Sequence, residues 1–238
     1  TSANNIVEDN TGRFGGGIYL STCYDPPEAE EEDDVDDCEE QTGTMLFSDS
    51  ESLFNANVAL DDGGAVYLNG DEMLDKIPIT ALFYKTEFSD NFSDDKGGAL
   101  FAYDYIGIDV QEANFNQNLG EGHGGAIYLY NSETDNHIYD TLFDRNVSYY
   151  SNGGAVYSYT DNHMLVENSR FFDNRSDDAG GAVYHINDFH LEVRDSIFES
   201  NETENRSGGA ISFENNSDFK YDITLTDNRF IENSAGLH

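Results

Sequence analysis

Basic side chains are scarce in this sequence. Its 238 residues include 11 lysines and arginines against 48 aspartates and glutamates, so the formal net charge is −37. Nucleic acids and anionic membranes attract proteins through clusters of lysine and arginine. We therefore expect this chain to bind no nucleic acid and no anionic membrane surface.

Long apolar runs are also missing. No stretch reaches the roughly eighteen consecutive apolar residues that a transmembrane helix needs, so we expect no membrane insertion in this segment. The opening residues do not resemble a signal peptide. Both ends of the sequence fall inside a repeating unit, which predicts a segment of a longer or processed protein whose targeting signal lies elsewhere.

Familiar catalytic motifs are absent as well. Neither Gly-x-Ser-x-Gly, the motif of serine hydrolases, nor His-Glu-x-x-His, the motif of zinc proteases, occurs in the chain. No Lys-Ser/Thr follows the Gly-Gly pairs, so these pairs are turn glycines rather than phosphate-binding loops. The absences favour a protein that is not an enzyme.

Cysteine is limited to Cys23 and Cys38. The two residues flank a stretch with 11 acidic and no basic side chains between Asp25 and Glu40, which cannot pack into a core. We interpret residues 21–50 as an acidic loop insertion closed by a disulfide, which would contribute about 3 kcal/mol and indicate an oxidising, extracellular setting. The alternative is a pair of free thiols.

Two short motifs alternate along the chain. Gly-Gly-Ala followed by an aliphatic residue starts at Gly63, Gly97, Gly124, Gly153, Gly180 and Gly208, and a Gly-Gly-Gly-Ile variant starts at Gly15. Phe-x-x-Asn starts at Phe54, Phe88, Phe115, Phe143, Phe171, Phe198 and Phe230. Most repeats are 27–29 residues long. Self-similarity at one period is typical of a solenoid.

The residues within one repeat predict strands. β-Branched and aromatic residues follow each Gly-Gly pair, and alternating apolar positions precede each phenylalanine, which indicates two or three short strands per repeat. Stacking repeats in parallel satisfies their backbone groups and places like residues about 4.8 Å apart. We predict an all-β, right-handed single-stranded parallel β-helix over residues 1–238, with about seven coils of 27–28 residues and the aliphatic column inside.

Gly-Gly-Ala-Ile/Val/Leu paired with Phe-x-x-Asn resembles the repeat of chlamydial polymorphic outer-membrane proteins. Similar repeats occur in predicted surface β-helix proteins of other bacteria, algae and related protists. The resemblance covers the chain except residues 21–50. It implies a parallel β-helix that is exposed at the cell surface, as the passenger of an autotransporter, and acts in adhesion.

An aromatic column follows the aliphatic one. On a strand of period two its side chains face outward, where they would form an exposed strip for sugars, partner proteins or lateral packing. The alternative is stacking between coils for stability alone. The column contains Tyr19, Tyr67, Phe101, Tyr128, Tyr157 and Tyr184.

An asparagine column ends each Phe-x-x-Asn motif, and its amides should form a buried ladder. It contains Asn57, Asn91, Asn118, Asn146, Asn174, Asn201 and Asn233. Glycosylation sequons occur at Asn91, Asn146, Asn174, Asn201, Asn205 and Asn215. A ladder position should not carry a sugar, so we expect glycans first at Asn205 or Asn215 in a eukaryotic secretory pathway.

Carboxylates and histidines offer two further possibilities. Acidic turn residues should stack in columns, with Asp61, Asp95 and Asp178 in one register, and could bind calcium. The candidates are Asp94, Asp95, Glu121, Asp177 and Asp178. The alternative is a solvated acidic surface with no cofactor. His163 and His190 hold equivalent places in adjacent coils, where a metal would need a third ligand that the sequence does not reveal.

These observations favour a non-enzymatic extracellular structural or adhesive module, one segment of a surface coat or filamentous appendage. Its partners would be other copies or further repeats of the same protein, other surface proteins, or carbohydrate. A carbohydrate-active β-helix enzyme of the polysaccharide lyase or hydrolase kind is one alternative. A calcium-dependent carbohydrate- or protein-binding module is the other.

Overall fold

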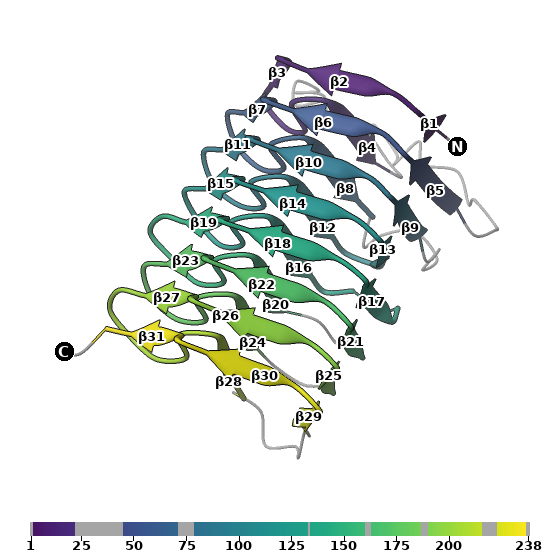
Figure 1. Cartoon of the computed structure of the whole chain (residues 1–238). Helices are drawn as coiled ribbons and strands as arrows, with labels where there is room; N and C mark the ends of the chain where they lie inside the picture. Colours follow the sequence, from purple (N-terminus) through teal and green to yellow (C-terminus); the bar gives the residue numbers. More distant parts are fainter. Residues whose placement is uncertain are drawn as a thin grey trace, which may run out of the picture.

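A computed structural model describes residues 2–21, 45–70, 79–132, 134–159, 163–186, 190–215 and 223–236. Within these ranges the chain folds into short strands and contains no helix. Each strand pairs in parallel with the strand four places further along the chain, so the coils stack into a β-solenoid (Figure 1). The predicted all-β parallel β-helix is confirmed. Cys23 and Cys38 lie outside the described residues, and their disulfide stays a prediction.

The stack has four parallel sheets, three of eight strands and one of seven in the described ranges. Sheet A contains β1 (Ser2–Ala3), β5 (Met45–Ser50), β9 (Ile79–Tyr84), β13 (Ile106–Gln111), β17 (Asn136–Tyr139), β21 (Met164–Glu167), β25 (Leu191–Arg194) and β29 (Ile223–Thr226). Sheet B contains β2 (Ile6–Glu8), β6 (Leu53–Asn55), β10 (Glu87–Ser89), β14 (Asn114–Asn116), β18 (Leu142–Asp144), β22 (Arg170–Phe172), β26 (Ile197–Glu199) and β30 (Arg229–Ile231). Sheet C contains β3 (Thr11–Gly12), β7 (Val58–Ala59), β11 (Phe92–Ser93), β15 (Leu119–Gly120), β19 (Val147–Ser148), β23 (Arg175–Ser176), β27 (Glu202–Thr203) and β31 (Ser234–Ala235). Sheet D contains β4 (Ile18–Ser21), β8 (Val66–Asn69), β12 (Leu100–Tyr103), β16 (Ile127–Tyr130), β20 (Val156–Tyr159), β24 (Val183–Ile186) and β28 (Ile211–Glu214).

A full coil therefore has four strands, where the sequence predicted two or three. The strands of sheet C cause the difference, because each spans only two residues after the ladder asparagine and shows no alternation that could be recognised. The motifs predicted about seven coils. Sheet D has seven strands, in agreement, and the other three sheets have eight because the first strands of an incomplete coil precede Gly15.

Two sharp corners flank each strand of sheet B. In the central coil, Asp140 and Arg145 adopt left-handed backbone conformations with φ of 52° and 54°, on either side of β18. The same two positions are left-handed in every coil from Glu51 onward. Non-glycine residues adopt this conformation at a cost, so the surrounding stack must stabilise it.

The glycine pair forms another corner. Gly124 has a φ of +70°, which favours glycine. Gly125 is needed for a different reason, because a Cβ atom there would lie 2.1 Å from the carbonyl oxygen of Gly154 in the next coil. The motif therefore serves both the turn and the close approach of neighbouring coils.

The core runs along the axis of the stack. The repeat phenylalanines from Phe54 to Phe198 are fully buried, and successive rings stack with centroids 4.6–5.1 Å apart. The aliphatic residues after Gly-Gly-Ala join the same cluster from sheet D, which places this column inside as predicted. Burying one such side chain contributes about 1.5–3 kcal/mol.

Candidate functional surfaces

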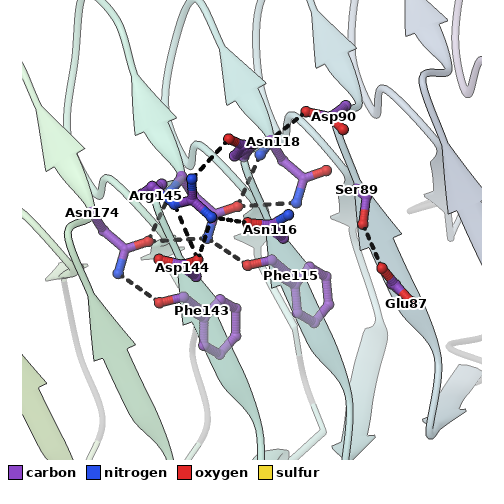
Figure 2. A network of polar contacts seen from close by, with 12 residues as sticks. Glu87, Ser89, Asp90, Phe115, Asn116, Asn118, Phe143, Asp144, Arg145 and Asn174 are labelled. Carbon is purple, nitrogen blue, oxygen red and sulfur yellow. Dashed lines mark hydrogen bonds and ion pairs between the residues drawn. The ribbon is translucent and has the colours of Figure 1, made fainter.

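The asparagines of Phe-x-x-Asn form a continuous hydrogen-bonded ladder at the corner between sheets B and C. The side-chain amide of Asn146 donates to Asn174 Oδ1 at 3.0 Å and to the carbonyl of Phe115 at 2.9 Å. Its Oδ1 accepts from the side chain of Asn118 at 3.0 Å and from the backbone N–H of Asn118 at 3.1 Å. Figure 2 shows the ladder amides of Asn118 and Asn174 with Arg145 close by, and the Arg145 side chain is exposed. Each amide thereby satisfies the turn backbone of an adjacent coil.

The ladder also explains the sequons within it. Asn91, Asn146, Asn174 and Asn201 are buried, and both amide hydrogens of each are used in the ladder. The sequon hydroxyls are buried as well, because that position faces inward from sheet C. They belong to Ser93, Ser148, Ser176 and Thr203. The fold of the corner therefore uses the asparagines of these four sequons, and we expect no glycan on them.

The remaining ladder and sequon residues differ in exposure. Asn57 and Asn118 are buried in the ladder, while Asn233 in the last coil is half-buried. Asn205 and Asn215 are exposed. Asn205 donates to Asp177 Oδ1 at 2.7 Å from a turn. The exposed pair remain the positions at which we expect glycans.

The aromatic column is not an exposed strip. Phe101, Tyr128, Tyr157 and Tyr184 are at most 7% exposed, and only Tyr19 in the first coil reaches 45%. Rings from Tyr19 to Tyr184 stack with centroids 4.8–5.3 Å apart. Burial raises the pKa of Tyr157 to about 12. The prediction of an exposed strip is therefore wrong, and stacking between coils is what the column does.

A column of covering residues buries these rings. The residue before each Gly-Gly pair folds back over the outer face of sheet D: Phe14 lies 5.0 Å from the Tyr67 ring and His123 lies 4.2 Å from the Tyr157 ring. Backbone hydrogen bonds align these residues in one register. We call them the cover column, which contains Phe14, Asp62, Lys96, His123, Asn152, Ala179 and Ser207. Sequence reasoning missed the column because its residue type changes in every coil.

The cover column borders a surface groove of about 480 Å³. Two exposed tyrosines stand at this corner: Tyr149 and Tyr150 are 54% and 66% exposed, and their rings meet edge to face 4.5 Å apart. The lining residues are Asp94, Asp95, Lys96, Glu121, Gly122, His123, Tyr150 and Ser151. An open aromatic ring among carboxylates suits contact with a polar ligand that also has an apolar face.

Burial alters two titratable groups in the cover column. The carboxyl of Asp62 has a pKa raised to about 6 by burial, against the opposing effect of Lys96. Burial and the charge of Lys96 lower the pKa of His123 to about 4. Ser151 Oγ lies 2.7 Å from His123 Nδ1, but a histidine this weakly basic is a poor general base.

The acidic turn residues occupy the expected registers, but other residue types interrupt their columns. Asp94 and Glu121 occupy equivalent places in adjacent coils and both line the groove. Asp61, Asp95 and Asp178 each stand two residues before a Gly-Gly pair and so share one register, but Gly122 and Ser151 hold this place in the two coils between Asp95 and Asp178. The carboxylate of Asp178 pairs with Arg206 at 2.7 Å. Asp177 accepts a hydrogen bond from Asn205. The carboxylates of Asp61, Asp62 and Asp95 converge, yet the ammonium of Lys96 already lies 3.7 Å from Asp62 Oδ1 and contacts Asp95.

His163 and His190 stack as expected, with ring centroids 5.2 Å apart. The structure adds Glu192, whose carboxylate shares a small cluster with both imidazoles. The sequence did not reveal this third group because the neighbouring coils have no acidic residue at the same place. The register partners of Glu192 are Leu165 and Thr224.

A family model described as the Chlamydia polymorphic membrane protein (Chlamydia_PMP) repeat matches residues 85–103. The matched segment includes one Phe-x-x-Asn motif and the following Gly-Gly-Ala-Leu. Together with the parallel stack, the match identifies a polymorphic membrane protein-type β-helix repeat, which is the repeat of a family of surface-associated membrane proteins. No match was found among curated proteins or solved structures. The described residues contain no helix able to cross a bilayer.

Proposed function

We propose that this polymorphic membrane protein-type solenoid is a non-enzymatic, extracellular structural or adhesive module, one segment of a surface coat or fibre. One observation carries the proposal: the side chains that recur in every coil are used for contacts between coils. The phenylalanine column is buried and stacked, and the asparagine amides bond from one coil to the next. The repeat is thus specialised for building a stiff rod.

The parallel stack supports association with like coils. Every described strand pairs in register with a strand of the same kind in the neighbouring coil. Strands of this kind favour pairing with like strands. The proposed partner is therefore another copy of this protein.

The groove beside the cover column supports an adhesive contact. Exposed aromatic rings bind the apolar faces of sugars, and neighbouring carboxylates accept hydrogen bonds from hydroxyl groups. Tyr149, Tyr150, Asp94 and Glu121 provide this combination on one side of the rod. Carbohydrate at the surface of a neighbouring cell or coat is therefore the proposed ligand of this face.

A binding and turnover assay tests the proposal. The chain is immobilised and exposed to a panel of neutral and acidic polysaccharides, with binding and chain cleavage measured on the same samples. We expect retention of at least one polysaccharide without cleavage, and loss of retention in Tyr150→Ala. Arg145→Ala, an exposed change at the corner between sheets B and C and outside the lining of the groove, is the control. Cleavage of a retained polymer would support the enzyme alternative and contradict a non-enzymatic module.

Assembly is tested separately by light scattering over a range of protein concentrations. The protein should self-associate as its concentration rises. A protein that stays monomeric at every concentration would contradict association between copies.

A further inference from the structure

Two histidines and a glutamate meet on the outer face of sheet A. His163 immediately precedes β21, His190 immediately precedes β25, and Glu192 is the second residue of β25. The backbone N–H of Met164 donates to the carbonyl of His190 at 3.0 Å, which fixes the two histidines in the same register on adjacent coils. One nitrogen or oxygen atom from each of the three side chains lies within 4.8 Å of the other two.

The cluster contains a polar atom without a partner. Within the described part of the chain, His163 Nε2 is shielded from solvent and makes no hydrogen bond. Glu192 Oε2 lies 3.7 Å from it, which is too far for a hydrogen bond. A buried polar atom of this kind usually indicates a missing ion or water.

Glu192 is held so that one oxygen faces the imidazoles. Arg194 Nη1 donates to Glu192 Oε1 at 3.3 Å, while Arg194 Nη2 pairs with Glu167 Oε2 at 3.0 Å. Glu192 Oε2 is thereby left to point toward His163. Outer partners that orient a carboxylate in this way are typical of metal ligands. With one arginine between two glutamates, the local charge is −1, which favours a cation.

We propose that His163, His190 and Glu192 bind a divalent transition-metal ion of the zinc class, with water completing the coordination. Two imidazole nitrogens and one carboxylate oxygen are a common donor set for zinc, at bond lengths of about 2.0–2.2 Å. Tetrahedral bonds of that length separate the ligand atoms by about 3.3 Å, close to the 3.7 Å between His163 Nε2 and Glu192 Oε2. Calcium is excluded by the donor set, because it prefers oxygen ligands in larger numbers.

The ion would connect two coils. His163 belongs to one coil, and His190 and Glu192 belong to the next, so a bound ion crosslinks them on the outside of the stack. Binding to the folded chain alone raises its stability in proportion to the logarithm of the ion concentration. The site is independent of the adhesive groove, which lies on a different corner of the coil.

Calorimetric titration of the tag-free 238-residue chain with Zn²⁺ tests the site. We expect one ion per chain and a rise in melting temperature that saturates with it. His163→Gln and Glu192→Gln should each weaken binding at least about tenfold, and circular dichroism establishes that the variants are folded. His137→Gln is the matched control, because His137 is a half-buried histidine on β17 of the same face, outside the cluster. Its affinity should equal that of the wild type.

The visible absorption of bound Co²⁺ provides a second measurement of metal binding, which does not depend on the melting temperature. Co²⁺ bound at the site should give the strong visible absorption of a four-coordinate ion, and Zn²⁺ should abolish it while a tenfold excess of Ca²⁺ should not. Equal zinc affinity in the wild type, His163→Gln and Glu192→Gln would overturn the proposal, as would displacement of Co²⁺ by Ca²⁺. Equal weakening by His137→Gln would show a diffuse surface effect and would overturn it as well.

Discussion

The phenylalanine column and the cover column run along the same coils but differ in how constant their residue type is. The inner position is phenylalanine in seven successive coils, with rings packed face to face and closed in by three sheets. The cover position changes from coil to coil and is in turn aromatic, acidic, basic, polar and small. Both columns bury aromatic rings, but the inner one lies within the core while the cover column lies across the outer face of sheet D. Confinement, rather than burial alone, is what fixes residue identity here.

The largest loss of stability should come from truncating a phenylalanine of the inner column. Phe143→Ala removes a fully buried ring with stacked neighbours on both sides and should lower the free energy of unfolding by about 4 kcal/mol. Phe230→Ala is the matched control, since Phe230 stacks on one side only and is 47% exposed. We expect about 1–2 kcal/mol there. Denaturant unfolding measures both, and equal losses would show that the stack is not what stabilises the motif.

The asparagine ladder should show a smaller effect of the same kind. Asn146→Ala leaves the carbonyl of Phe115 and the backbone N–H of Asn118 without partners in a buried corner. The expected loss is about 3 kcal/mol. Asn233→Ala, at the half-buried end of the ladder, should cost about 1 kcal/mol. A loss below 1 kcal/mol for Asn146→Ala would mean that water replaces the amide and that the corner is open to solvent.

The features that could be predicted from the sequence are those of the inner columns, and the features that could not be predicted are those of the cover column. The inner aliphatic and phenylalanine columns, the ladder and the parallel stacking could be deduced from spacing, because the same residue or the same class of residue recurs at each of these places. The cover column could not, since many side chains can lie across a tyrosine ring and no pattern marks the position before Gly-Gly. The error about an exposed aromatic strip came directly from that omission. Glu192 was missed for a related reason: it occurs in one coil and makes no column.

The cover column should be where pH acts on stability. Burial raises the pKa of Asp62 from the ordinary 3.8 to about 6 in the folded chain, so ionisation of this carboxyl destabilises the fold as pH rises from 4 to 6. His123 has a folded pKa of about 4, lowered from 6.5, so stability is lost as pH falls from 6.5 to 4. The charged groups facing both are Lys96 and Asp95, with Asp61 also facing Asp62.

Variants separate these opposing effects. Relative to wild type, Asp62→Asn should gain stability as pH rises from 4 to 6, and His123→Gln should gain stability as pH falls from 6.5 to 4. Each difference is on the order of 1 kcal/mol because both sites are partly solvated. Melting curves across this range provide the measurement. Parallel profiles for both variants and the wild type would mean that neither group titrates abnormally.

A change in salt concentration should have the smallest effect on the stability of the fold. With a net charge of −37, the chain repels itself, and screening should raise the melting temperature by a few degrees between low and physiological ionic strength. We propose that Ca²⁺ at matched ionic strength raises it further through Asp94 and Glu121, which occupy neighbouring coils. Asp94→Asn should remove the additional effect of calcium and leave that of sodium chloride. A melting temperature indifferent to both salts would contradict an ionic role for this column.

Hydrogen exchange tests most directly the claim that recurring residues are fixed by contacts on both sides of the stack. The backbone amides of residues 142–148, in a central coil, should exchange at least about tenfold more slowly than those of residues 229–235, which hold the same places in the last coil. The two segments contain the same motif, so any difference comes from the neighbouring coils. Equal exchange rates in the two segments would contradict the account, because the motif would then be stable without a coil on each side.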